Sequence, residues 1–348
     1  MSTEKEKAWE EGYKAFCEAS ELEYYFDGEN KKSPEAYEQN LLDIASWYLK
    51  RHERPHSWEE VERNLEAGKK RGDAEYIYYY ACYHYEPDDD MFLKLVEESA
   101  NKGFTEAQAE MGWQLYHNGE HVVTPEVLEW YKKAAEGGHS YGQWQYGDYY
   151  LKCCLEKSSD KSEWVLSAGK TAEDLNTALE WVRKAIKGNV TSAMCRMGDI
   201  YGIGVAGVVE KDETKAFEYY FKAAECGDNS GSLACGIAYE EGRGVNKDYV
   251  QARHFYQKAY DVANDGVSFD SEASFRLGRL LYNAIGGVED KSAGEFMMRD
   301  AVESAFARDW DDDDDLRMVL DSLNIKKIML TDNGREIYTY GLPARRCD

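Results

Sequence analysis

Residues 193–205 read AMCRMGDIYGIGV, and this phrase recurs along the chain. Each copy has a small residue, an apolar residue and a glycine four and five places later, and usually an aromatic residue three places beyond the glycine. Other clear copies are AQAEMGWQLYHNG at 107–119, GSLACGIAYEEGRGV at 231–245 and ASFRLGRLLYNAIG at 273–286. The glycines are Gly112, Gly147, Gly198, Gly236 and Gly278, at spacings of 35, 51, 38 and 42 residues. Repetition at this period predicts a stacked array of helical pairs.

The phrase places its shared residues on one face of a helix. At about 100° per residue the four positions fall on one side, as they do for Ala193, Met197, Gly198 and Tyr201. A glycine inside a helix costs about 1 kcal/mol relative to alanine. Its return at the same helical phase therefore predicts that a neighbouring helix approaches too closely there for a side chain. The glycines of GIGV at 202–205 are expected to end this helix.

A second phrase follows the first and predicts the second helix of each pair. It reads LEWYKKAAEGG at 128–138, ALEWVRKAIKG at 178–188, AFEYYFKAAECG at 216–227 and ARHFYQKAY at 252–260. Asp212 and Glu213 favour a helix start before the third copy, because carboxylates are stabilised at the positive N-terminal end of a helix. This helix is expected to end at 226–228. Alanine and tyrosine alternate along its apolar stripe, which suits close packing of two short antiparallel helices.

Together the two phrases resemble the repeat of the Sel-1-like family, which is related to tetratricopeptide arrays. The resemblance is closest in 193–227 and 231–260 and covers about residues 65–305. Residues 65–85 look like the end of one repeat and the first helix of the next, with Ala81 in place of the glycine. The resemblance implies an all-α fold, an α/α superhelical solenoid of antiparallel helix pairs. It also implies a non-catalytic scaffold or adaptor that binds a peptide or protein partner on its concave face.

Outside the array the sequence predicts two different ends. We expect an N-terminal helical cap at 1–56, an array of about six helix pairs at 57–305 with an insertion at 151–173, and a C-terminal cap at 306–348. The C-terminal cap contains the acidic run Asp311–Asp315, a short helix at 316–323 and a β-hairpin with its turn at Asn333–Gly334. The hairpin either covers the last helical pair or offers an edge to a partner strand.

The charge restricts the classes of partner. The 348 residues include 67 acidic and 42 basic side chains, a formal net charge of −25. This argues against nucleic acid, whose phosphates require lysine and arginine, and against docking on an anionic membrane. It is compatible with a basic protein partner, and equally with solvated helix faces that need no partner. Since the sequence has no secretory signal and no run of about 18–20 apolar residues, the expected location is the cytoplasm.

The eight cysteines do not form two CxxC pairs, which argues against a structural zinc site. In a reducing compartment most of them should be free, buried thiols. A bridge between Cys226 and Cys235, and redox sensitivity of the adjacent Cys153 and Cys154, are the alternatives.

The sequence contains none of the common catalytic motifs. No GxxxxGK[ST], GxSxG or HExxH pattern occurs. His52 and His56 have the spacing of one helix face, but Pro55 between them should break that helix. Asp88–Asp90 is expected to cap the helix that follows, and Asp311–Asp315 is expected to be a solvated cap. We therefore expect no catalytic, cofactor or metal site and no enzymatic activity.

One helix face remains for function. Counted from the small residue that opens each first helix, positions +2, +3 and +6 lie at about 200°, 300° and 240°, away from the buried stripe. A purely solvated face would not carry large apolar residues there, and aromatic rings with arginine are typical of protein-recognition surfaces. The candidate partner-binding residues are Trp113, Trp144, Arg196, Leu233, Ile237, Phe275, Arg276 and Arg279. The alternative is that these side chains pack against neighbouring repeats.

Two kinds of binder remain open. The first is the scaffold or adaptor that the resemblance implies, which leaves the partner unnamed. The second is a bacterial immunity or antitoxin-type inhibitor that blocks a toxic enzyme, and the net charge of −25 favours a basic target such as a nuclease. Salt separates the two, because attraction between opposite charges weakens with ionic strength whereas contact through aromatic side chains does not.

Overall fold

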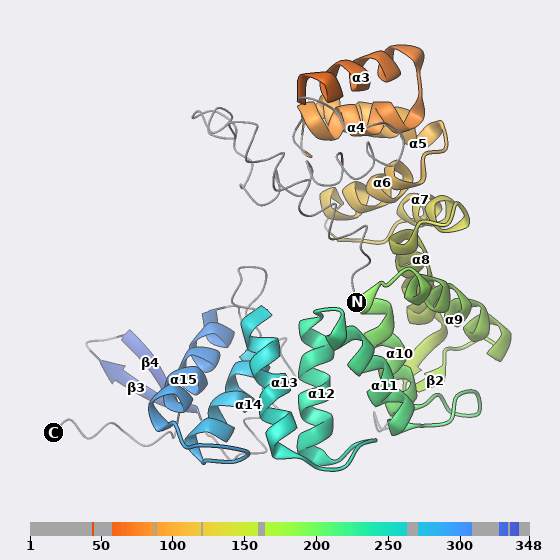
Figure 1. The fold of residues 1–348 in the computed structure, drawn as a ribbon. Coiled ribbons are helices and arrows are strands. Elements are labelled where there is room, and N and C mark those ends of the chain that lie inside the picture. Colours follow the sequence, from red (N-terminus) through yellow and green to blue (C-terminus); the bar gives the residue numbers. More distant parts are fainter. Residues whose placement is uncertain are drawn as a thin grey trace, which may run out of the picture. The chain divides into compact units, whose positions relative to one another are not determined.

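The computed structural model describes Ile44, residues 58–307 except 86, 88, 120, 159–163 and 263–270, and residues 327–332 and 335–340. The chain divides into two compact units, Met1–Tyr146 and Gly147–Asp348 (Figure 1). Apart from Ile44, the expected N-terminal cap lies outside the described residues, and so do His52, His56 and Asp311–Asp315. The segment boundaries expected at 56/57 and 305/306 stay predictions.

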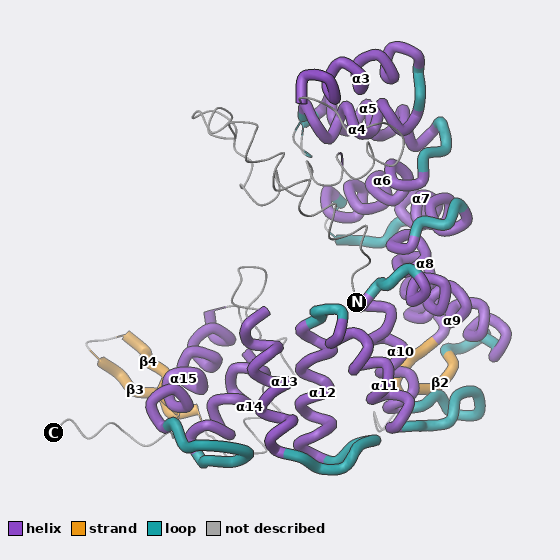
Figure 2. The backbone as a smooth tube through the Cα atoms, in the orientation of Figure 1, coloured by secondary structure: helices purple, strands orange, loops and turns teal. Residues whose placement is uncertain are grey.

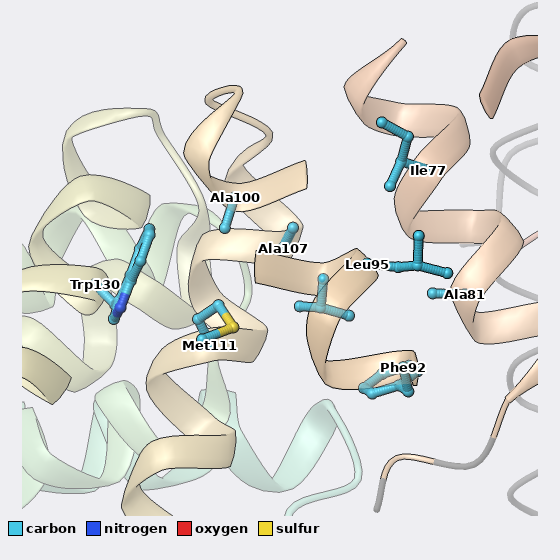
Figure 3. Packing of buried hydrophobic residues seen from close by; sticks show 9 residues of the cluster. Ile77, Ala81, Phe92, Leu95, Ala100, Ala107, Met111 and Trp130 are labelled. Carbon is cyan, nitrogen blue, oxygen red and sulfur yellow. The ribbon is translucent and has the colours of Figure 1, made fainter. Parts of the chain in front are cut away.

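The first unit consists of helices that each pack on the next one along the chain. They are α3 (Trp58–Arg71), α4 (Ala74–His84), α5 (Asp90–Asn101), α6 (Thr105–Asn118), α7 (Pro125–Glu136) and the start of α8 (Ser140–Cys154). Helices α4 to α7 all contribute to one core cluster, which includes Ile77, Phe92, Met111 and Trp130 (Figure 3). The predicted break within 65–85 falls between α3 and α4, and Ala81 at the glycine position is fully buried.

The second unit continues the same alternation. It contains the end of α8, α9 (Ala172–Lys187), α10 (Thr191–Ile203), α11 (Glu213–Glu225), α12 (Asn229–Glu241), α13 (Tyr249–Val262), α14 (Ser271–Tyr282) and α15 (Lys291–Ala307). The largest interhelical contacts join α10 with α11, α12 with α13, and α14 with α15, and Figure 2 shows these helices lying side by side. The predicted fold class, an all-α solenoid of helix pairs, is confirmed.

The repeated glycine marks the closest approach of the two helices in a pair, as predicted. A Cβ atom placed on Gly198 would lie 2.4 Å from Cε1 of Tyr220, and one placed on Gly236 would lie 2.4 Å from Cδ1 of Tyr256. Gly112 meets the ring of Tyr131 in the same way, at 2.7 Å. Because contacts this short do not occur between real carbon atoms, the tyrosine of the second helix requires glycine on the first.

The helix ends follow the predicted caps. Asp212 precedes α11 and its Oδ1 accepts the backbone N–H of Lys215 at 3.0 Å. Asp89 caps α5 by accepting the N–H of Met91 at 2.6 Å. Gly204 follows α10 with a φ of 83°, but its ψ of 168° makes it extended and not left-handed helical.

The insertion at 151–173 was expected to be a longer connector, and most of it is regular structure. Its first residues finish α8, and a short antiparallel hairpin follows, made of β1 (Leu155–Lys157) and β2 (Trp164–Leu166). Trp164 also bridges to Val205 in the turn after α10, where its carbonyl accepts the N–H of Ala206 at 2.9 Å. The insertion therefore joins the backbone of the following repeat.

The C-terminal hairpin is confirmed. Strands β3 (Lys327–Asp332) and β4 (Arg335–Tyr340) are antiparallel, and Asp332 pairs with Arg335 across the two-residue connection. Whether this hairpin covers the last helical pair or accepts a partner strand stays a prediction.

The described cysteines are free thiols, and they include Cys226, Cys235, Cys153 and Cys154. Cys154 and Cys235 are buried as expected, whereas Cys226 is exposed. The alternative of a Cys226–Cys235 bridge is therefore wrong for this structure.

Candidate protein-interaction face

The candidate residues lie on the first helices of the pairs, at positions +2, +3 and +6, and we call this side of those helices the first-helix face. Trp113 is on α6 and Trp144 on the part of α8 that belongs to the first unit. The other six candidates are in the second unit, on α10, α12 and α14. Their surroundings differ between the two units.

Phe275 is not available to a partner. Its side chain is only 1% exposed, because α14 packs against both α13 and α15 and is covered on two sides. The expectation that this ring contributes to an open face is wrong. Leu233 and Ile237 of α12 are half-buried and pack against the core cluster that contains Tyr256 and Leu277. At these three positions the structure supports the alternative of packing between repeats.

Arg196 of α10 connects two first helices. Its Nε donates to Oδ1 of Asp148 on α8 at 2.9 Å, and its Nη1 lies 3.8 Å from Oδ2 of Asp199. Asp148 is buried, and Lys152 Nζ lies 2.8 Å from its second oxygen. A buried carboxylate that holds two cations indicates that Arg196 links consecutive repeats.

Arg276 and Arg279 of α14 form a second polar link, around Glu240 of α12. Arg279 donates to Oε1 of the buried Glu240, and Nη1 of Arg276 lies 3.5 Å from Oε2. The hydroxyl of Tyr256 donates to the same Oε2 at 2.6 Å. Burial raises the pKa of Tyr256, so this hydroxyl keeps its proton. The Nε of Arg276 donates to Glu272 at 2.7 Å. Both arginines are thus engaged inside the unit.

In the first unit the face carries aromatic rings that remain partly open. Trp113 is half-buried, and its ring stacks on His117 with a centroid separation of 3.9 Å and an interplanar angle of 28°. The Nδ1 of His117 donates to the carbonyl of Trp113 at 2.9 Å, which fixes the imidazole orientation. On α8, Trp144 is half-buried and lies one turn from Tyr141, whose side chain is 36% exposed.

Glu110 lies on the same side of α6, one turn before Trp113, and was not among the candidates. Gln114 Nε2 donates to its Oε1 at 2.8 Å. Burial raises the pKa of the Glu110 carboxyl, against the opposing effects of the Gln114 hydrogen bond and of His117. Burial also raises the pKa of the Tyr78, Tyr131 and Tyr141 hydroxyls, and the Glu110 charge adds to each of these shifts. The charge of Glu110 on α6 therefore acts on tyrosine hydroxyls of α4, α7 and α8.

The second-helix tyrosines also have a polar role that the sequence pattern did not predict. Tyr220 donates to Oδ1 of Asp199 at 2.8 Å, just as Tyr256 donates to Glu240. Each ring covers the glycine of its pair, and its hydroxyl reaches a carboxylate on the first helix. The signal was a tyrosine in three copies of the second phrase, at Tyr131, Tyr220 and Tyr256.

The described part of the chain shows neither a metal-binding cluster nor a membrane-spanning helix. No group of three or more histidine, cysteine, aspartate or glutamate side chains there is placed to hold a metal ion. None of the helices in that part combines the length and the apolar character needed to cross a bilayer.

A profile of the Sel1 repeat matches residues 105–139, 166–190, 191–228 and 232–263. Two curated relatives are chitin synthase regulators SKT5. That of Saccharomyces cerevisiae is 27% identical over 153 residues, which are 42% of this chain and 20% of that protein. That of Malassezia restricta is 29% identical over 108 residues, which are 31% and 7%. This chain thus spans less than a third of the length of these relatives.

Two solved structures share the fold. A Sel1 repeat protein from Oxalobacter formigenes has a TM-score of 0.55 and 20% identity, with 75% of this chain and 96% of that one covered. The protective antigen c5321 of uropathogenic Escherichia coli strains, which displays an SLR fold, has a TM-score of 0.54 and 23% identity, with 79% and 57% covered. The Sel1 repeat is a non-enzymatic fold through which proteins generally contact other proteins. The four matched repeats coincide with the helices described above between residues 105 and 263, so this chain contains an array of Sel1 repeats.

Proposed function

We propose that this chain is a non-catalytic scaffold that binds a protein or peptide partner on the first-helix face of α6 and α8. One observation carries the proposal: Trp113 and Trp144 are only half-buried on successive first helices. The candidates in the second unit differ. Their arginines form ion pairs within that unit, and their leucine, isoleucine and phenylalanine side chains pack within it. Partly exposed tryptophans are the residues that most often anchor a protein partner.

The state of the thiols supports a non-catalytic role. Burial raises the pKa of Cys235 to about 12, and burial likewise raises the pKa of Cys195, whose thiol also donates to Asp228 at 3.4 Å. A nucleophilic cysteine requires the opposite shift, because the thiolate is the reactive form. Both thiols therefore stay protonated at neutral pH.

The net charge of −25 favours a second candidate, an inhibitory binder that blocks a basic enzyme. Binding of that kind depends on long-range charge attraction and weakens strongly with salt. Binding that depends on the two tryptophans retains most of its affinity as salt is raised.

The test begins with affinity purification of the chain from its native host, followed by mass spectrometry to identify the partner. The purified partner is then titrated calorimetrically against wild type, the double variant Trp113→Ala/Trp144→Ala, and the control Phe296→Ala. Phe296 is 64% exposed on α15, so its removal takes away an even more open ring outside the proposed face.

Loss of two anchor residues should weaken binding by about 30-fold or more, which corresponds to about 2 kcal/mol. Circular dichroism and the melting temperature should stay near those of wild type. Equal affinities for wild type and the double variant, or an equal loss in Phe296→Ala, would show that the partner binds elsewhere.

A further inference from the structure

Glu110 is a carboxylate that no described lysine or arginine neutralises. Among the described residues it forms no ion pair with lysine or arginine, and its hydrogen-bond partner is the neutral amide of Gln114. Its side chain is half-buried on α6, in surroundings that already disfavour its charge. A carboxylate removed from water is unfavourable unless a positive charge compensates it.

Asp148 and Glu240, two buried acids of the first helices, each have such a cation from the next first helix. Asp148 of α8 receives Arg196 of α10, and Glu240 of α12 receives Arg276 and Arg279 of α14. Arg196 and Arg276 occupy position +3 of their helices.

The first helix that follows α6 is α8, and its position +3 is Gln145. Its amide donates to the hydroxyl of Tyr141, one turn earlier on the same helix. Within the described residues Glu110, at position +3 of α6, therefore receives no arginine from the next first helix, whereas Asp148 at +6 and Glu240 at +9 do.

The groups beside Glu110 suit a guanidinium. Trp113 and Gln114 lie three and four residues further along α6, and His117 lies seven further, so one helix face presents all of them. A guanidinium can pair with a carboxylate through two parallel N–H groups and lie against an aromatic ring at the same time. The local charge is also favourable, since residues 57–146 contain 18 acidic and 8 basic side chains.

We propose that an arginine side chain of the partner pairs with Glu110 beside Trp113 and thereby supplies the cation that this carboxylate does not receive from the described residues. This inference rests on the proposed function, because it assumes that the partner lies along the first-helix face of α6 and α8. The partner is then a polypeptide with an accessible arginine.

The test uses a display library of random dodecapeptides selected on the immobilised full-length chain. Selected peptides and their Arg→Lys and Arg→Gln versions are titrated against wild type and four variants. Glu110→Gln removes the charge but keeps the shape. Gln145→Arg supplies the arginine from within the chain and should block the site while raising the melting temperature. Trp113→Ala/Trp144→Ala removes the face itself, and Glu97→Gln removes an exposed carboxylate of α5 as the charge-matched control.

The expected result is enrichment of arginine at one peptide position. Binding should fall about 30-fold or more in Glu110→Gln, in Gln145→Arg and in the Arg→Gln peptide, with little change in Glu97→Gln. Peptides that need the two tryptophans but carry no essential arginine, or that bind Glu110→Gln as tightly as wild type, overturn this inference and leave the proposed function intact. An equal preference for lysine overturns the assignment to arginine. Peptides indifferent to the tryptophans, or no binders at all, overturn both.

Discussion

Replacing Gly198 with alanine tests whether the recurring glycine makes room for the second helix. The added Cβ would lie 2.4 Å from Cε1 and 2.7 Å from Cδ1 of Tyr220, well inside the ordinary carbon–carbon contact of about 3.5–4.0 Å. The ring cannot withdraw without cost, because its hydroxyl donates to Asp199 at 2.8 Å. Accommodating the methyl group therefore requires either a shift of α11 or loss of this hydrogen bond.

The expected magnitude combines three contributions. Overpacking costs about 1–3 kcal/mol, and the strained hydrogen bond costs about 1 kcal/mol more. The higher helix propensity of alanine returns about 1 kcal/mol. The net expectation is a loss of about 2 kcal/mol. Gly202 of the same helix is the matched control, because a Cβ there would meet only Ala216 Cβ at 3.6 Å and Tyr220 Oη at 3.9 Å. Gly202→Ala should therefore be neutral or stabilise by up to about 1 kcal/mol.

The assay is urea unfolding of the full chain followed by far-UV circular dichroism, with both variants repeated in a Tyr220→Ala background. Removal of the ring should abolish the cost of Gly198→Ala and leave the effect of Gly202→Ala unchanged, which a double-mutant cycle measures directly. If Gly198→Ala stabilises the wild type, or still destabilises the protein after the ring is gone, the steric explanation is refuted.

Three further predictions follow from individual contacts. Phe275→Ala should lower the free energy of unfolding by about 3–5 kcal/mol in the same urea titration, because the ring is 1% exposed, and a loss below about 1 kcal/mol would contradict its place in the core. Thr171→Ala removes the capping box of α9 and should cost about 1 kcal/mol, whereas no change would show that the cap is dispensable. Burial raises the pKa of Glu110 in the folded state above its value in the unfolded state. As the pH rises through this range, ionisation of Glu110 therefore lowers the free energy of unfolding of the wild type. Glu110→Gln has no carboxyl at this position and lacks this contribution. Glu110→Gln should therefore melt at a higher temperature than wild type at pH 7, and the difference should shrink as the pH falls. A difference that grows toward acid pH would contradict this prediction.

The helix pairs could be predicted because two kinds of residue recur in phase. Glycine on the first helix and tyrosine on the second are complementary halves of one contact, as Gly198 with Tyr220 and Gly236 with Tyr256 show. The C-terminal hairpin was predictable for a similar reason, since Asn333–Gly334 is a local turn signal. The hairpin of β1 and β2 was not, because its strands have three residues each, too few to show an alternating pattern.

The candidate site was predicted less well. Helical phase tells which way a side chain points, but it does not tell whether a neighbouring helix buries that side chain. Positions +2, +3 and +6 point away from the core stripe of their own pair, yet in α14 they meet neighbouring helices, which is why Phe275 is buried. The arginines were found, but their acidic partners are distant in sequence, 48 residues for Arg196 and Asp148. Only the structure shows that no described lysine or arginine pairs with Glu110, whose partner is the Gln114 amide.

The central claim is that a partner binds the first-helix face of α6 and α8, and site-specific photo-crosslinking in the native host tests it most directly. A photoreactive aromatic amino acid replaces Trp113 in one variant and the exposed Lys132 on α7 in a control. The account predicts one discrete crosslinked polypeptide from position 113, absent or much weaker from position 132. Crosslinking to the same polypeptide from position 132 alone, or with equal yield from both positions, would contradict it.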